Sequence, residues 1–220
     1  YAGIFYAGPG AVRMENILIR WMAEILGYPN TALGNLASGG SIATLVAITT
    51  ARDAKKVKAS MIEQSVIYLT AQVHHCIHKA FRIAGMGESV FRYIPLNGQF
   101  QMDTNHLRKQ LALDREAGLK PFMLIGTAGT TDTGAIDPLD ELADIAQQND
   151  LWFHVDAAYG GFFVLVDRLK PTFKGIERSD SVVIDPHKGL FLPYGLGAVI
   201  IRDVPAQYRA HFYQANYMQD

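Results

Sequence analysis

Three segments of the 220-residue sequence carry residue types that could do chemistry together. They are a glycine-glycine-serine run (LASGGSIATL), an aspartate followed by two alanines (WFHVDAAYGG), and a lysine after proline and histidine (DSVVIDPHKGLFLPYG). Each adjoins an apolar run that is typical of a buried strand or helix. In order, they could supply a cradle for an anion, a fixed negative charge and a nucleophilic amine.

The glycine-rich segment places Gly40 and Ser41 at the start of a helix predicted over residues 41–55. Free backbone N–H groups and a hydroxyl at a helix N-terminus suit a phosphate group. Gly-Gly-Ser is also a common way to enter a buried helix. Taken alone, the segment favours this ordinary structural interpretation.

Asp156 and Lys188 each follow an apolar strand, where an unpaired charge would be costly. A helix cap or a structural ion pair would account for Asp156. So would the protonated ring nitrogen of a flat ligand, for which Ala157 and Ala158 leave room. A desolvated Lys188 could be a nucleophile, or it could simply extend from the sheet end into solvent. The residues alone leave these alternatives open.

Short strands alternating with helices predict an α/β fold with three αβα layers and a mostly parallel sheet. The expected strands are 66–70, 90–95, 122–127, 151–156, 181–185 and 196–203. The expected helices are 11–26, 41–55, one from His74, 104–118, and 139–148, the last capped by Asp137. Such sheets bind ligands at the carboxyl ends of their strands, where Thr127–Thr131, Asp156 and Asp185–Lys188 stand.

Composition excludes several classes of protein. A net charge of −1 without a charged run argues against binding to nucleic acid or to a membrane surface. No apolar run is long enough to cross a membrane. The single cysteine, Cys76, favours a reducing compartment, and we expect a cytoplasmic protein. The N-terminus has neither an initiator Met nor a basic stretch, as expected of a chain entered mid-sequence rather than a signal peptide.

The histidines near residue 75 raise the alternative of a metal site. His74 and His78 have the i, i+4 spacing of a zinc-binding helix. No glutamate follows His74 as in the H-E-x-x-H motif. We therefore predict no metal, and we expect His75 and His78 to be surface or packing residues.

Together, the segments resemble the pyridoxal-phosphate-dependent group II amino-acid decarboxylases, which act on aromatic amino acids, glutamate, cysteine sulfinate or diaminobutyrate. HVDAAYGG and DPHK are the most specific pieces. The order of GGS, a histidine, GTT, HVDAA and PHK also matches, over practically the whole chain. The resemblance implies an aminotransferase-like (fold type I) large domain over residues 1–220. It also implies that the family's N-terminal segment and C-terminal small domain are absent.

The resemblance assigns roles to particular residues. Lys188 would hold pyridoxal 5'-phosphate as a Schiff base, and Asp156 would pair with its ring nitrogen. The others would surround the cofactor: His74 stacked on the ring, Ala158 on its other face, Thr131 beside it, and Gly40, Ser41 and His187 at the phosphate. Tyr217 matches the family's loop tyrosine that donates a proton, although an ordinary aromatic in a C-terminal helix is an equal alternative.

The implied reaction is decarboxylation of an L-amino acid to an amine and CO2, with an aromatic substrate slightly favoured. Alternatives are an acidic or diamino-acid decarboxylase, a lyase, a transaminase, an aldehyde synthase or a non-catalytic fragment. A homodimer with its site at the interface is also implied. Gly189 stands where members often carry Trp or Met, and Asp185 where many carry Asn. Neither departure is expected to affect the lysine chemistry.

Overall fold

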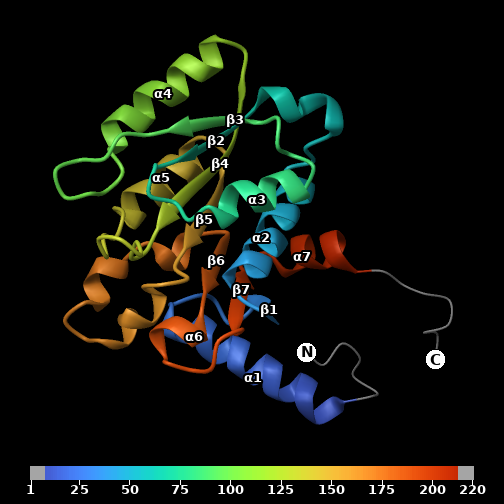
Figure 1. Cartoon of the computed structure of the whole chain (residues 1–220). Coiled ribbons are helices and arrows are strands. Elements are labelled where there is room, and N and C mark those ends of the chain that lie inside the picture. The colour runs from blue at the N-terminus through green and yellow to red at the C-terminus, as the bar shows by residue number, and fades with distance from the viewer. Residues whose placement is uncertain (1–7, 213–220) are drawn as a thin grey trace, which may run out of the picture.

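The computed structural model describes residues 8–212 and centres on a seven-stranded sheet in the order β1-β7-β6-β5-β4-β2-β3 (Figure 1). The strands are β1 (Leu33–Ala37), β2 (Ser65–Leu69), β3 (Val90–Tyr93), β4 (Lys120–Thr127), β5 (Trp152–Asp156), β6 (Ser181–Ile184) and β7 (Gly197–Ile201). Five neighbouring strands, from β6 to β3, are parallel, and β7 alone runs antiparallel to both of its neighbours. The mostly parallel sheet predicted from the sequence is confirmed.

Helices cover both faces of the sheet. They are α1 (Pro9–Ile25), α2 (Gly40–Ala54), α3 (Cys76–Ile83), α4 (Thr104–Glu116), α5 (Leu139–Gln148), α6 (Pro186–Gly189) and α7 (Val204–His211), with 3-10 turns η1 (Ala59–Gln64), η2 (Gly161–Leu165), η3 (Lys170–Phe173) and η4 (Ile176–Arg178). Helices α1, α4 and α5 pack on one face, and α2 and α3 on the other (Figure 1). Because the strands are buried on both faces, they are apolar runs rather than alternating ones.

Alternate residues of each strand enter the two separate cores, as the two-residue period of a strand requires. On β4, Leu124 packs under α4 and α5, while Met123 and Ile125 pack under α2 and α3. The two cores hold the strands in register, so their carboxyl ends form a fixed edge. This edge carries the polar residues singled out in the sequence.

Three details differ from the sequence-based expectations. Strand β1 was not predicted, because Gly34 and Asn35 interrupt its apolar residues, and pairing with β7 stabilises it. Helix α3 begins at Cys76 rather than at His74, and His74 Nδ1 accepts the Cys76 N–H at 3.3 Å. Asp137 does not cap α5, because its carboxylate is buried and accepts two N–H groups from outside that helix.

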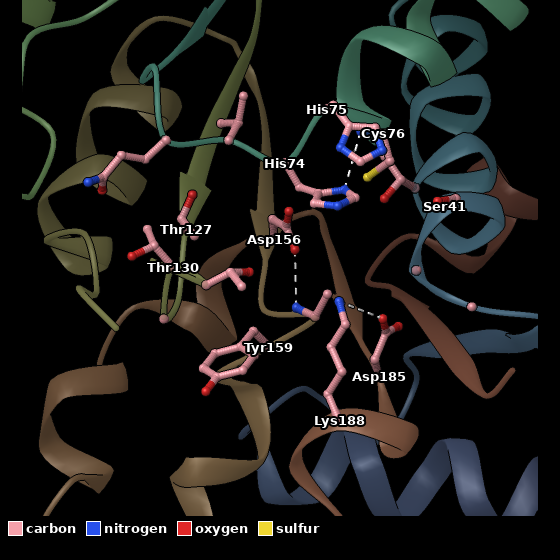
Figure 2. A pocket seen from close by; sticks show the side chains of 18 of the residues that line it. Ser41, His74, His75, Cys76, Thr127, Thr130, Asp156, Tyr159, Asp185 and Lys188 are labelled. Carbon is pink, nitrogen blue, oxygen red and sulfur yellow. Dashed lines mark hydrogen bonds and ion pairs between the residues drawn. The ribbon is translucent and has the colours of Figure 1, made fainter. Parts of the chain in front are cut away.

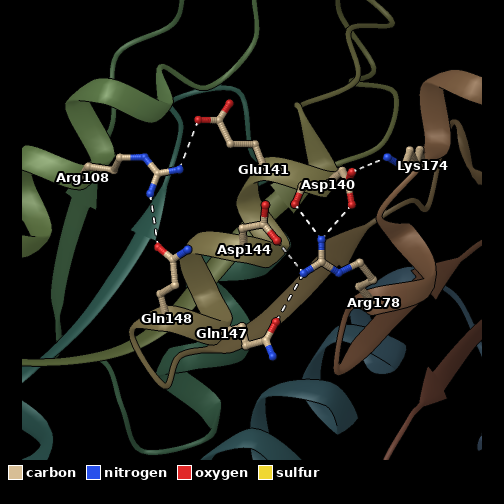
Figure 3. Close-up of polar contacts among 8 residues, drawn as sticks. All are labelled: Arg108, Asp140, Glu141, Asp144, Gln147, Gln148, Lys174 and Arg178. Carbon is tan, nitrogen blue, oxygen red and sulfur yellow. Dashed lines mark hydrogen bonds and ion pairs between the residues drawn. The ribbon is translucent and has the colours of Figure 1, made fainter.

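Helix α5 is tied to its surroundings by polar contacts on the surface (Figure 3). Arg178 pairs with Asp140 and Asp144 at 2.7 Å each, and Lys174 pairs with Asp140 at 2.7 Å. Such exposed pairs contribute little individually, typically about 0–1 kcal/mol each. The buried cores therefore dominate stability, and these contacts fix the segment that follows β5. Among residues 8–212, no helix has the length and apolar character needed to span a bilayer.

Candidate active site

A pocket of about 400 Å³ lies at the carboxyl ends of β4, β5 and β6. Thr127 at the end of β4 lies in register with Asp156 at the end of β5. The pocket is closed by the start of α2, the segment before α3 and the short helix α6 (Figure 2). Eight of the expected site residues line it: Gly40, Ser41, His74, Thr131, Asp156, Ala158, His187 and Lys188. Tyr217 lies outside the described residues.

Lys188 reaches the pocket from α6, a single turn that follows β6. Its Nζ lies 3.1 Å from Oδ2 of Asp185, which is only 1% exposed. The expectation that Asp185 does not affect the lysine is therefore wrong: its carboxylate is the lysine's ion-pair partner (Figure 2). The sequence signal was the spacing, since residues three apart in a helical turn are neighbours.

Asp156 is 8% exposed, and its Oδ1 accepts the Ala158 N–H at 3.1 Å. It caps no helix and belongs to no ion pair in the part of the chain that the structure describes. Neither a helix cap nor a structural ion pair therefore accounts for the Asp156 carboxylate within residues 8–212. Because a buried carboxylate needs a positive partner, this geometry favours a cationic ligand atom in the pocket.

His154 lies two residues before Asp156 on the same strand face, and it was overlooked in the sequence. Its Nδ1 lies 2.8 Å from Oγ of Ser181. Burial lowers the pKa of His154 to about 4, so the ring is neutral at pH 7. A neutral neighbour leaves the negative charge of Asp156 available to a ligand.

The start of α2, where the sequence predicts an anion cradle, lies in the wall of the pocket. Gly39 adopts φ 138°, a conformation that favours glycine, and it leads into the first helical residue, Gly40. The first N–H groups of a helix lack intrahelical partners, so those of Gly40 and Ser41 could bind an anion. The His187 ring lies beside this segment, and its Nδ1 accepts the Leu196 N–H at 3.2 Å.

His74 also lines the pocket, from the turn between β2 and α3 (Figure 2). Its ring centroid is 4.0 Å from that of His75. Partial burial, and then the neighbouring His75 and Lys188, lower the pKa of His74. The imidazole is therefore largely neutral at pH 7. No group of three potential metal ligands occurs among residues 8–212.

The loop after β4, which contains Thr130 and Thr131, packs closely against the turn after β5. A side chain at Gly160 would lie 2.4 Å from the Ala128 carbonyl oxygen, so only glycine fits there. Thr131 is exposed at the pocket rim, whereas Thr130 is buried and its hydroxyl lies 2.7 Å from that of Thr133. Pocket residues not anticipated from the sequence include Ser38, Thr44, Gln72, Cys76, Tyr159 and Tyr194.

Several buried polar atoms of the pocket have no hydrogen-bond partner within residues 8–212. They are Thr44 Oγ1, Gln72 Oε1, Thr127 Oγ1 and Asp185 Oδ1. Buried polar groups are normally satisfied, so unsatisfied ones need an explanation. Their presence around one pocket indicates a polar ligand.

Comparison with known proteins identifies the family. Residues 4–220 match the pyridoxal-dependent decarboxylase conserved domain. The chain belongs to the pyridoxal-dependent decarboxylases. It is 40% identical to an aromatic-L-amino-acid decarboxylase of Bacillus atrophaeus, with 90% of this chain aligned to 41% of that protein. It is 33% identical to the rat (Rattus norvegicus) cysteine sulfinic acid decarboxylase, with 96% of this chain aligned to 44% of the relative.

Solved structures of decarboxylases share the fold. The tryptophan decarboxylase of Catharanthus roseus in complex with L-tryptophan superposes with a TM-score of 0.88 at 31% identity, over 96% of this chain and 48% of that one. The Oryza sativa TDC with PLP and tryptamine gives 0.91 at 29% identity, over 98% and 47%. The expected fold type I is thereby confirmed. The chain spans less than half the length of these relatives.

The pocket fits pyridoxal phosphate, the cofactor of this decarboxylase family. The amides at the start of α2 suit its phosphate, and the unpaired Asp156 suits a protonated ring nitrogen. Lys188 is the amine that projects between them (Figure 2). Gly189, which replaces the family's Trp or Met, packs against Phe162: an added Cβ would come 2.7 Å from that of Phe162.

Substitutions of His74 test whether its ring supports the cofactor. His74→Ala should weaken cofactor binding roughly threefold to tenfold, because stacking of aromatic rings contributes about 0.5–1.5 kcal/mol. His74→Phe should retain most of the affinity, since it keeps a flat ring. Both variants lose the hydrogen bond from the Cys76 N–H equally. The dissociation constant would be measured by titrating the cofactor into the stripped complete protein.

His78→Ala is the matched control for this experiment. His78 lies on α3 and its Nε2 is 3.1 Å from the Tyr93 hydroxyl, outside the pocket. Its removal should leave cofactor affinity unchanged. Equal affinity of His74→Ala and the unmodified protein would show that the ring of His74 carries no cofactor contact.

Proposed function

We propose that residues 1–220 form the cofactor-binding large domain of an enzyme that converts an L-amino acid to its amine and CO2. The single observation that carries this proposal is the convergence of Lys188 and Asp156 on one pocket from the ends of neighbouring strands. One residue supplies an amine and the other an unpaired carboxylate. Membership of the decarboxylase family supports the same reaction.

In this function, several residues of the pocket have defined roles toward the cofactor. When bound, pyridoxal phosphate supplies the electron sink that makes loss of the substrate carboxylate feasible. Lys188 would hold the cofactor through its side-chain amine. Asp156 keeps a proton on the ring nitrogen through its negative charge, while Gly40 and Ser41 hold the phosphate through backbone N–H groups. His74 and Ala158 orient the ring.

The remaining expected residues hold the cofactor and complete the reaction. Thr131 contacts the cofactor from the pocket rim, and His187 lies at the phosphate. Tyr217 is the proposed donor of the proton that completes the amine. Its position downstream of Lys188 supports this role, and an ordinary structural tyrosine is the alternative.

An aromatic amino acid is the favoured substrate. The 40% identity to an aromatic-L-amino-acid decarboxylase supports this choice over acidic and diamino acids. Tyr159 and Tyr194 line the pocket. No arginine lines it within residues 8–212, although a substrate with a second acidic group would be expected to need one.

Product analysis of the complete protein tests this function. Incubation with a panel of aromatic, acidic and diamino acids should yield an amine and CO2 in equal amounts, fastest with an aromatic substrate. Mass spectrometry would identify the amine, and trapping of labelled CO2 would give the ratio. A ketoacid product would indicate a transaminase, and an aldehyde with ammonia would indicate an aldehyde synthase. Either result would contradict the proposed reaction.

A cytoplasmic homodimer is the proposed form of the enzyme. Phe191 and Tyr194, just after Lys188, are 92% and 93% exposed, and Met14 and Ile17 of α1 are also exposed. Exposed apolar residues that gather on one face are typical of interfaces. The exposed residues of α1 and those after α6 belong to neighbouring parts of the surface. Trp21 of α1 stacks on Phe162 with ring centroids 6.1 Å apart, and Phe162 contacts α6. The single free cysteine supports a reducing compartment.

A further inference from the structure

Asp185 is a second buried carboxylate of the pocket, with a task that differs from that of Asp156. Its Oδ2 lies 3.1 Å from Lys188 Nζ and 3.9 Å from His187 Nε2. Its Oδ1 has no hydrogen-bond partner in the described part of the chain. The carboxylate is therefore directed mainly at the lysine amine (Figure 2).

Two glycines confine the Asp185 carboxylate to this position. A Cβ added at Gly40 would come 2.7 Å from Oδ2, and one added at Gly197 would come 2.8 Å from Oδ1. The carboxylate thus fills space that exists only because both residues lack side chains. The Lys188 N–H also donates to the Asp185 carbonyl at 2.9 Å, which fixes the two residues on one turn.

Within residues 8–212, only one of the two buried carboxylates has a positive partner. Asp156 accepts the Ala158 N–H and makes no ion pair with Lys188 within residues 8–212. Asp185 pairs with Lys188 instead. An asparagine at position 185 would match the shape of aspartate but would supply no charge to the amine.

We propose that Asp185 is a positioning residue that holds the Lys188 ammonium in the pocket whenever this lysine is not bonded to the cofactor. The inference rests on the proposed role of Lys188 as the cofactor-binding lysine. The ion pair keeps the Lys188 amine in the pocket while the substrate, instead of the lysine, is attached to the cofactor. It also restrains the amine from reacting with other electrophiles. Charge-assisted hydrogen bonds of this kind are the stronger ones in proteins.

Competitive labelling of the cofactor-free complete protein tests this proposal. Trace acetic anhydride would be added at pH 8, and mass spectrometry would compare the Lys188 peptide with the exposed Lys58 as internal reference. In Asp185→Asn, relative labelling of Lys188 should rise by about tenfold or more, since loss of the charged partner frees the amine. Asp185→Ser, which is smaller and clashes with neither glycine, should show the same rise if the asparagine variant folds poorly.

Two controls separate loss of charge from loosening of the pocket. Cys76 is buried in the same pocket, so its reaction with iodoacetamide should be unchanged in both variants. Asp132→Asn removes an exposed carboxylate from the rim and should leave Lys188 labelling unchanged. Equal Lys188 labelling with and without Asp185 would overturn the proposal, as would a parallel rise at Cys76. Because no cofactor is present, neither result bears on whether Lys188 binds pyridoxal phosphate.

Discussion

Lys188→Ala is expected to reduce turnover by on the order of 10³-fold or more, because it removes the only amine proposed to bond the cofactor. The unmodified protein with pyridoxal phosphate should be yellow, and the variant should lose this colour. Borohydride should fix the cofactor on the peptide that contains Lys188. Absorbance spectra and peptide mass spectrometry give these readouts without depending on the identity of the substrate.

Lys58→Ala is the matched control for the lysine experiment. Lys58 is exposed and lies outside the pocket, so its removal should change neither the colour nor the turnover. Fixation of the cofactor on any lysine other than Lys188 would refute the central assignment. A Lys188→Ala variant with normal turnover would refute it equally.

Asp156→Asn is expected to lower turnover by about 10²–10³-fold and to weaken cofactor binding, as for loss of one preorganised electrostatic partner. The change preserves size, and the Asn Oδ1 can still accept the Ala158 N–H seen at 3.1 Å. It removes only the charge that would hold a proton on the ring nitrogen. The ¹⁵N chemical shift of isotopically labelled cofactor would report directly on that proton.

Asp132→Asn provides the comparison for this second prediction. Asp132 is an exposed carboxylate at the rim of the same pocket, so its loss changes the net charge equally. The ring-nitrogen shift should be unaffected in this variant. Near-normal turnover in Asp156→Asn, or an identical ring-nitrogen shift, would mean that Asp156 is a structural residue.

The residues of the site were accessible to sequence reasoning because they stand directly after apolar strands. Asp156 ends strand β5 and Lys188 follows strand β6, and parallel strands place their carboxyl ends on one edge of a sheet. The layered α/β fold was also predictable, since runs buried on both faces are apolar throughout. Tyr217 stays a prediction, as it lies outside the described residues.

Other features depend on contacts between distant segments. Strand β1 forms because β7 offers it a partner, not because Gly34 and Asn35 favour a strand. Asp137 was expected to cap α5, but its carboxylate accepts the N–H groups of Met102 and Thr127 instead. Local sequence patterns cannot predict such partners, because these interactions join residues that are brought together only by folding.

The sequence by itself determined the fold class, the alternation of strands and helices other than β1, and the strand ends at which the amine and the carboxylate lie. Only the tertiary structure decided how the charges pair. It assigned Asp185 rather than Asp156 to Lys188, because two glycines from distant segments, Gly40 and Gly197, confine the Asp185 carboxylate beside the amine. Pairing of charges depends on distances of a few ångströms and on desolvation, and both arise only when the strands and loops pack.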